Sequence, residues 1–376
     1  MVSLDKVLKY YQPTKYIVSS DDYNDNYQIP VLTAGKSFLL GYTDDKNGVF
    51  EELPAIIFDD FTTSFHFVDF PFKVKSSALK ILVPRNKEVN IKYVYYRMIG
   101  LKIDTELHKR YWISKFSKLQ IDLPNIETQK QIAQILDNAA ALRDKTKKLL
   151  TEYDALAQSI FLDMFGDPVV NPKEWETKTI EKLVLKEKGS IKRGPFGGAL
   201  KKEIFVNEGY LVYEQYHALN NDFDFERYYI DDNHFEKLKG FEVKPGDIII
   251  SCSGVYLGKL AIIPENAKKG IINQALLKIT LDEDKMRKEF FVFHFTQENF
   301  RIKYFDANRG AGIPNFPPMS SFKKFPFVTP PIEVQNEFVE KLKLIEQQKE
   351  LAKQELKESE DLFNCLLQKA FKGELV

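Results

Sequence analysis

The sequence predicts an α+β fold in which two globular domains alternate with two long antiparallel helices of coiled-coil type, related by a pseudo-twofold internal repeat. Two observations predict it. One is a stretch of about forty residues, 125–165, without Gly or Pro and with apolar residues three and four apart. The other is a second copy of that stretch near the C-terminus. A helix of about 60 Å cannot bury an apolar stripe against itself, so each helix needs the other.

The repeat needs no gap over its whole length. Adding 206 to a residue number (330 − 124) takes each helix residue onto its counterpart. A repeat of this length fixes the architecture as globule, helix, globule, helix. Identical pairs are Pro124 and Pro330, Ile126 and Ile332, Glu127 and Glu333, Gln129 and Gln335, Leu136 and Leu342, Leu150 and Leu356, and Phe165 and Phe371.

Composition allows two domains and gives no sign of a membrane. Hydrophobic residues make up 44% of the chain and aromatic residues 13%, enough for two cores. The first residues form no apolar signal core, and no apolar run could cross a bilayer, so we expect a cytoplasmic protein. Cys252 and Cys365 show no metal or disulfide spacing. Because the net charge is zero, any DNA affinity must come from local patches or from partner subunits.

The first globular domain, residues 1–124, is predicted to consist mainly of strands. Turn residues such as 44–48 separate strand-like runs, and a short helix follows them before a basic, aromatic segment. The predicted strands are 27–32, 55–58 and 64–75, the helix is 91–99, and the basic segment is 108–112.

The central helix, 125–167, ends at Phe165-Gly166-Asp167-Pro168, where a glycine cap and a proline stop it. The second globular domain, 168–330, is predicted to begin with a strand at 180–185 and to carry a glycine-rich loop, 194–198, between basic pairs. The remaining predicted elements are a strand at 248–250 after a turn at 244–247, a short helix at 289–298, a loop at 309–315 and the C-terminal helix, 331–376.

Three polar residues interrupt the apolar stripes of the long helices. Thr146 interrupts the first stripe, and Lys349 and Ser359 interrupt the second. Polar residues at seam positions specify register in coiled coils. We therefore expect these three to set the register of the antiparallel pair.

The motifs of several enzyme classes are absent. The segment 34–37 resembles the end of a phosphate-binding loop, but Pro30 occupies the place of the required glycine. Asp59-Asp60 fits a structural turn better than a metal-dependent nuclease site. The segment 315–318 holds the residues of an amino-methyltransferase motif in the wrong order, and the five histidines lack metal-ligand spacing. We expect neither catalysis nor a metal on this chain.

With the repeat in place, the chain resembles the specificity subunits of type I restriction-modification systems over essentially its full length. Three features carry the resemblance: the repeated run 119–129 and 325–335, the ends of both helices, and the Gly-Pro-Phe-Gly-x-x-Leu opening within 191–201. The helix ends are Phe-Gly-Asp-Pro at 165–168 and Phe-Lys-Gly-Glu-Leu at 371–375.

The resemblance implies a non-catalytic subunit that chooses a DNA site. Each globule would be a target recognition domain for one half of a split double-stranded DNA sequence, and the helices would set the unread spacer. The helices would also dock two adenine-specific methyltransferase subunits, which bind S-adenosylmethionine, while this chain holds no cofactor. Motor-nuclease restriction subunits would join that core.

Base reading needs side chains that form paired hydrogen bonds, held on loops, while lysines and backbone amides hold phosphates. Glycines beside Phe196 would let the backbone approach a phosphate closely. The candidates in the first domain are Lys15, Lys36, Thr62, Thr63, His108, Lys109 and Arg110. Those in the second are Lys192, Arg193, Gly194, Phe196, Gly197, Gln215, Tyr216, Lys259, Asn273, Gln274, Arg309 and Asn315.

Two alternatives of other classes stay open at this point. One is the recognition part of a single-chain restriction-methyltransferase, which predicts catalytic motifs on the same polypeptide. The other is a two-module scaffold for protein or peptide ligands, which predicts no DNA affinity even beside methyltransferase subunits.

Overall fold

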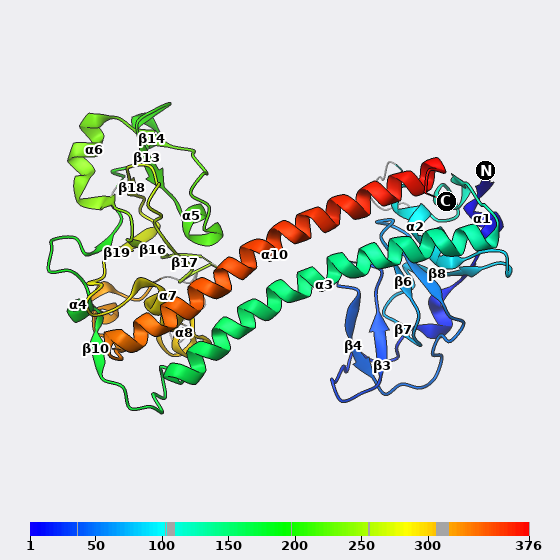
Figure 1. Ribbon diagram of the computed structural model, residues 1–376, viewed down its shortest axis with the longest axis horizontal. Helices are drawn as coiled ribbons and strands as arrows, with labels where there is room; N and C mark the ends of the chain where they lie inside the picture. The colour runs from blue at the N-terminus through cyan, green and yellow to red at the C-terminus, as the bar shows by residue number, and fades with distance from the viewer. Residues whose placement is uncertain are drawn as a thin grey trace. The chain divides into compact units, whose positions relative to one another are not determined.

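The computed structural model describes residues 1–35, 37–101, 103, 110–196, 198–254, 256–305 and 316–375. The chain forms two compact units: unit 1 is Met1–Lys148 with Ala352–Val376, and unit 2 is Leu149–Leu351. Figure 1 shows the two long helices, α3 (Ile126–Phe165) and α10 (Ile332–Lys372), each without a break. Each helix contributes one half to each unit. The two predicted long helices are therefore confirmed.

Unit 1 contains an antiparallel sheet with the strand order β2-β8-β5-β6 and a smaller sheet with the order β4-β3-β7, in which β3 and β7 are parallel. A third pair joins β1 to β9. The strands are β1 (Val2–Ser3), β2 (Leu8–Tyr11), β3 (Ile29–Leu32), β4 (Leu39–Thr43), β5 (Ala55–Asp59), β6 (Phe65–Val68), β7 (Lys73–Val74), β8 (Leu79–Pro84) and β9 (Gln120–Ile121). The short helices are α1 (Leu4–Val7), η1 (Pro13–Tyr16), α2 (Ile91–Ile99) and η2 (Phe116–Lys118).

Unit 2 contains an antiparallel sheet with the order β11-β19-β16-β17 and a second sheet with the order β12-β14-β13-β18-β15. The strands are β10 (Thr177–Thr179), β11 (Ile191–Arg193), β12 (Phe205–Val206), β13 (Tyr210–Tyr213), β14 (Tyr229–Ile230), β15 (Glu242–Val243), β16 (Ile248–Ser251), β17 (Leu260–Ile262), β18 (Gly270–Ile272), β19 (Leu276–Ile279) and β20 (Pro326–Val328). The short helices are α4 (Ile180–Leu183), η3 (Lys202–Ile204), α5 (Gln215–Asn220), α6 (Asp232–Leu238), η4 (Lys239–Phe241), α7 (Lys288–Thr296), α8 (Glu298–Tyr304) and α9 (Met319–Phe322).

The four-stranded sheets of the two units have the same topology. In each sheet the strand that comes first in the sequence pairs with the one that comes last, β2 with β8 and β11 with β19. The second and third strands in the sequence then follow, β5 and β6 in unit 1 and β16 and β17 in unit 2. Each second sheet contains one parallel pair, β3 with β7 and β13 with β18. The duplication that the helices show in sequence thus extends to the globular parts in structure.

Two predicted strands differ in the structure. Residues 180–183 form the helical turn α4, because Ile180 and Leu183 are both fully buried and three residues apart, a helical spacing. The predicted strand 64–75 is two strands, β6 and β7. Pro71 lies between them and cannot donate a hydrogen bond to a ladder.

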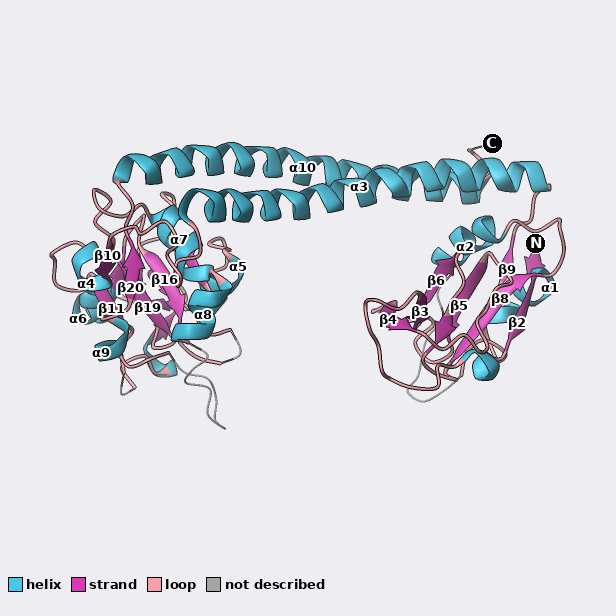
Figure 2. Cartoon of the chain, turned by 90° about the horizontal axis from the view of Figure 1, so that it is seen from below, coloured by secondary structure: helices cyan, strands magenta, loops and turns pink. Residues whose placement is uncertain are grey.

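A short helix in each unit packs between the four-stranded sheet and the halves of the long helices, as Figure 2 shows for α2 in unit 1 and α7 in unit 2. In unit 2 this layer is aromatic. Phe290 of α7 lies 4.7 Å, between ring centroids, from Phe165 of α3, which lies 5.5 Å from Phe338 of α10. These contacts bind the sheet to the helices inside the unit. In the part of the chain that is described, no helix is long and apolar enough to cross a membrane.

The repeated glutamine explains why the start of each long helix is copied so closely. Gln129 is buried, and its Oε1 accepts a hydrogen bond from the backbone N–H of Asn90 (2.8 Å). Its Nε2 donates to the backbone oxygens of Glu88 (2.9 Å) and Pro124 (2.7 Å). One side chain therefore ties the loop before α2 to the start of α3.

Gln335 makes the equivalent bonds in unit 2, to Arg287 N, Lys285 O and Pro330 O. We expect Gln335→Ala to lower the free energy of unfolding by about 3 kcal/mol, because it leaves buried backbone groups without partners. Urea denaturation measures this loss. Gln347→Ala on the exposed face of the same helix is the matched control and should change little. Equal stability of the two variants would contradict the role assigned to Gln335.

The three polar interruptions occupy the predicted seam. Thr146 and Ser359 are buried, and their hydroxyls donate to the backbone oxygens of Leu142 and Glu355. In unit 2, Lys349 Nζ lies 2.8 Å from Asp154 Oδ1. That ion pair joins the two long helices, so it can contribute to register, which stays a prediction.

Candidate nucleic-acid interface

Three loops of unit 2 leave the same edge of its four-stranded sheet. Arg193, at the end of β11, pairs with Leu277 of β19, and Ser251, at the end of β16, pairs with Leu276 of β19. The strands are antiparallel, so the end of β11, the end of β16 and the start of β19 lie together. We call this the unit 2 edge: the described residues 193–196, 252–254, 256–259 and 273–275. It gathers most of the described candidates of the second domain.

Gly194 fixes the first loop of the unit 2 edge. Its N–H donates to the backbone oxygen of Leu276 (2.9 Å), and a Cβ at this position would lie 1.8 Å from the backbone oxygen of Asn273. Only glycine leaves room for this approach. The space that was expected to admit a phosphate is filled at Gly194 by the backbone of Asn273.

Arg193 and Lys192 are adjacent in sequence, but successive strand residues face opposite sides of a sheet. The Arg193 guanidinium lies 5.4 Å from the centroid of the Phe196 ring, and its Nε is buried without a hydrogen-bond partner. Lys192 Nζ instead lies 4.8 Å from the centroid of Phe241. The structure brings Arg193 and Phe196 together and sends Lys192 elsewhere.

Gln215, at the start of α5, is turned inward. Its Nε2 donates to Ser251 Oγ (2.8 Å) and to the backbone oxygen of Ser253 (2.9 Å). Through these hydrogen bonds the Gln215 side chain supports the loop that follows β16. Tyr216 beside it donates its hydroxyl hydrogen to Asp222 Oδ2 (3.1 Å).

The remaining described candidates of unit 2 differ in exposure and in hydrogen bonding. Gln274 and Lys259 are exposed, whereas Asn273 Oδ1 accepts a hydrogen bond from Ala275 N (3.0 Å). Tyr256, which was not among the residues predicted from the sequence, is 56% exposed on the loop after β16. The available signal was an aromatic residue between two glycines, Gly254 and Gly258, which both have φ +76.

Within the unit 2 edge, burial raises the pKa of the Cys252 thiol to about 12, so the thiol stays neutral. Cys252 belongs to the main apolar core of this unit. Among the described residues, no group of His, Cys, Asp and Glu could hold a metal ion.

Unit 1 presents the equivalent edge, formed by the end of β2, the end of β5 and the start of β8. We call it the unit 1 edge: η1, residues 60–64 and Arg110. Asp59 Oδ1 accepts hydrogen bonds from the N–H groups of Phe61 (2.9 Å) and Thr62 (2.7 Å), and Thr63 has φ 60. In this tight turn Thr62 is exposed and Thr63 is half-buried. Arg110 lies 5.8 Å from the ring centroid of Phe61.

Asp60 holds the segment after Arg110 against this turn. Its Oδ1 accepts hydrogen bonds from the backbone N–H groups of Tyr111 (3.1 Å) and Trp112 (2.8 Å), and its Oδ2 lies 3.3 Å from Lys80 Nζ. Asp60 and Lys80 are both almost fully buried. The structural interpretation of Asp59-Asp60 is thus confirmed. Lys15 lies exposed on η1, which follows β2 at the same edge.

The other candidates, Lys36, His108, Lys109, Gly197, Arg309 and Asn315, lie outside the described residues.

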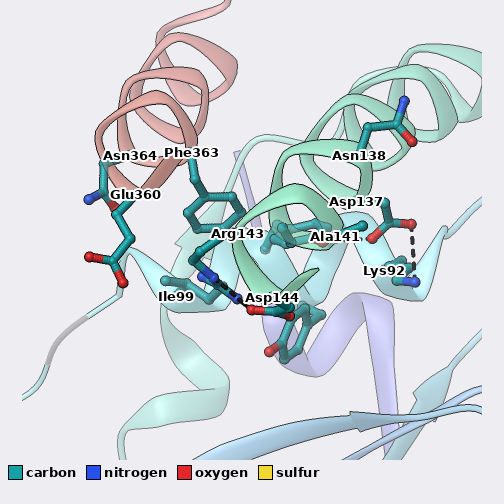
Figure 3. A pocket seen from close by; sticks show the side chains of 13 residues that line it. Lys92, Ile99, Asp137, Asn138, Ala141, Arg143, Asp144, Glu360, Phe363 and Asn364 are labelled. Atoms are coloured by element: carbon teal, nitrogen blue, oxygen red, sulfur yellow. Dashed lines mark hydrogen bonds and ion pairs between the residues drawn. The ribbon is translucent and has the colours of Figure 1, made fainter. Parts of the chain in front are cut away.

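Unit 1 also has a groove of about 770 Å³ between α2, α3 and the end of α10, shown in Figure 3. Both positive and negative side chains line it, and they form two ion pairs: Lys92 with Asp137 (3.0 Å) and Arg143 with Asp144 (2.8 Å). Burial, with a hydrogen bond to Asp137, raises the pKa of Tyr96 on its wall. Because its charges are mixed in sign, this groove is a poor phosphate site.

Comparison with known proteins adds to this geometry. Residues 1–152 and 172–360 match the family model described as type I restriction modification DNA specificity domain. The specificity subunit of the Escherichia coli type I restriction enzyme EcoR124I/EcoR124II is 40% identical over 187 residues, which are 46% of this chain and 45% of that relative. The match thus spans less than half of that relative's length.

Two further proteins are similar over most of the chain. The MjaVIII specificity subunit of Methanocaldococcus jannaschii is 23% identical over 305 residues, 76% of this chain and 71% of the relative. The crystal structure of a type I restriction-modification S subunit from M. genitalium matches with a TM-score of 0.52 and 17% identity, covering 98% of this chain and 95% of the other. That likeness shows the fold.

Proposed function

Because this chain belongs to the family of type I restriction-modification specificity subunits, we propose that each of its two units reads one half of a bipartite DNA site. The observation that carries the proposal is the equivalent edge in each unit. Each unit presents the corresponding end of its own four-stranded sheet, and the side chains at the two edges differ. Reading two unlike sequences with one scaffold needs this combination of a constant frame and variable loops.

In unit 2, Arg193 and Gln274 have the chemistry for base edges, since arginine can bind guanine and glutamine can bind adenine through paired hydrogen bonds. Lys259 supplies a charge for a phosphate. In unit 1, Arg110 has the same chemistry as Arg193, and Thr62 and Thr63 add hydroxyls. Gln215 serves as support for the loop after β16 rather than as a reader.

We propose that α3 and α10 set the number of unread bases and dock two methyltransferase subunits that bind S-adenosylmethionine, with restriction subunits joining the complex. This chain would perform no chemical step itself. Leucines on the outer faces of both helices support docking, because exposed apolar rows mark partner surfaces. They are Leu142 and Leu156 on α3 and Leu344 and Leu351 on α10.

Inserting four helical residues between Ala139 and Leu150 should lengthen the spacer between half-sites by one or two bases. One added turn is about 6 Å of helix, and a base step is about 3.4 Å. Mapping methylated bases in a host that expresses the variant with its methyltransferase measures the spacer. An unchanged spacer with normal methylation would remove the helices as the ruler.

The binding of DNA by the chain in complex with its methyltransferase subunits tests the proposed function. We expect a specific duplex to be retained in a gel shift against excess random DNA. A complex that forms but retains no DNA would favour the alternative of a scaffold for protein ligands.

A further inference from the structure

The first loop of the unit 2 edge carries an aromatic ring that reading by hydrogen bonds does not explain. The Phe196 side chain is 66% exposed. No other Phe, Tyr or Trp in the described parts of the chain is as exposed. Leaving such a ring in water forgoes the free energy that burial of apolar surface provides. Its position therefore indicates a partner that covers it.

The loop that carries the ring is fixed at its base. On one side the Arg193 guanidinium lies 5.4 Å from its centroid, and Arg193 is anchored in β11 by its pairing with β19. On the other side the chain is pinned at Gly194, whose N–H bonds to Leu276 O and whose Cα lies against the backbone of Asn273. A large ring on a rigid base loses little conformational entropy when it is covered.

The surroundings of the ring favour nucleic acid over protein as that partner. Exposed Gln274 and the Arg193 guanidinium lie at the same edge as the ring, and both have the hydrogen-bonding chemistry of base edges. An apolar ring placed among such groups matches the wedges that DNA-bending proteins insert between base steps. Stacking on a base also suits an aromatic side chain whose other contact is a cation.

We propose that Phe196 inserts between two stacked bases of the half-site that unit 2 reads, with Arg193 fixing the ring. This proposal rests on the proposed function. Insertion partly unstacks the step and kinks the duplex. The same distortion lowers the free energy needed to turn a neighbouring base out of the helix, which a base-modifying partner must do.

The test uses the full chain in complex with its methyltransferase subunits and a duplex carrying its mapped methylated motif. 2-Aminopurine, whose fluorescence rises when it is unstacked, replaces each adenine of the unit 2 half-site in turn. At saturating protein we expect a rise at one position with the wild-type chain. Phe196→Ala should lose that rise and bind the duplex about 10- to 100-fold more weakly.

Phe70→Ala is the matched control, because Phe70 is an exposed phenylalanine in the β6–β7 loop of unit 1. It should behave like wild type. If Phe196→Ala keeps both the fluorescence rise and the affinity, insertion is wrong while the proposed function stands. If Phe196→Ala no longer assembles with the methyltransferase, the ring is a protein contact and the proposal is overturned. If the wild-type complex binds no duplex, the proposed function itself fails.

Discussion

Replacing Gly194 by alanine is expected to abolish recognition of one half-site while leaving both units folded. The added Cβ would lie 1.8 Å from the backbone oxygen of Asn273, 2.5 Å from its carbonyl carbon and 3.0 Å from Gln274 N. Backbone atoms cannot rotate out of the way as a flexible side chain can. The loop after β11 and the loop before β19 therefore cannot both keep their places, and Arg193, Phe196 and Gln274 lose their arrangement.

We expect the affinity of the complex for its site to fall about 100-fold, as a loss of two or three well-placed base contacts requires. Fluorescence anisotropy with the cognate duplex measures it, and circular dichroism checks the fold. Gly240→Ala is the matched control, because nothing lies within 4 Å of its Cβ position. Wild-type affinity in Gly194→Ala would show that the unit 2 edge does not contact DNA.

Replacing Asp60 by alanine is expected to lower the free energy of unfolding of unit 1 by about 3–5 kcal/mol, because it leaves the buried Lys80 ammonium without its countercharge. The N–H groups of Tyr111 and Trp112 lose their acceptor at the same time. Arg110 precedes them, so the unit 1 edge loses its order as well as its stability.

Urea denaturation measures this effect. Asp69→Ala is the control, because Asp69 is an exposed aspartate directly after the last residue of β6. The double variant Asp60→Leu with Lys80→Met should recover most of the loss, since replacing a buried pair by apolar residues is often neutral. If Asp60→Ala were as stable as Asp69→Ala, Asp60 would not anchor this edge.

The long helices could be predicted because their signal is local. An unbroken three-and-four period and a Gly-x-Pro end act within a few turns of chain. The repeated glutamine was visible as a repeat, but its function was not. Its distant partners lie before α2 and α7, 39 and 41 residues before Gln129 and 48 and 50 residues before Gln335.

The candidate interface was predicted only as a set of loops, because its geometry depends on distant pairings. The pairing of β11 and β16 with β19 brings Arg193, Ser251 and Leu276 together. Nothing near those residues in sequence announces the pairing. Likewise, the Gln215 side chain has the hydrogen-bonding groups of a base reader. Only its hydrogen bonds to Ser251 and Ser253 show that it supports the loop after β16 instead.

The helical turn α4 was missed for a related reason. Four residues give too few periods to separate a helical spacing from a strand's alternation. Tyr256 was missed because single aromatic residues are common in sequences. Its exposure results from the turns at two glycines, which only the backbone conformation shows.

Each sheet edge is proposed to read its own half of one split DNA site. Single-molecule methylome sequencing tests it in a host expressing the chain with its methyltransferase, with three versions of the chain: wild type, Arg193→Ala with Gln274→Ala, and Thr62→Ala with Arg110→Ala. The account predicts a split adenine-methylated motif in the wild type. Each double variant should relax or lose only one half, and a different half in each case. The absence of any motif, or a motif that neither variant alters, would contradict it.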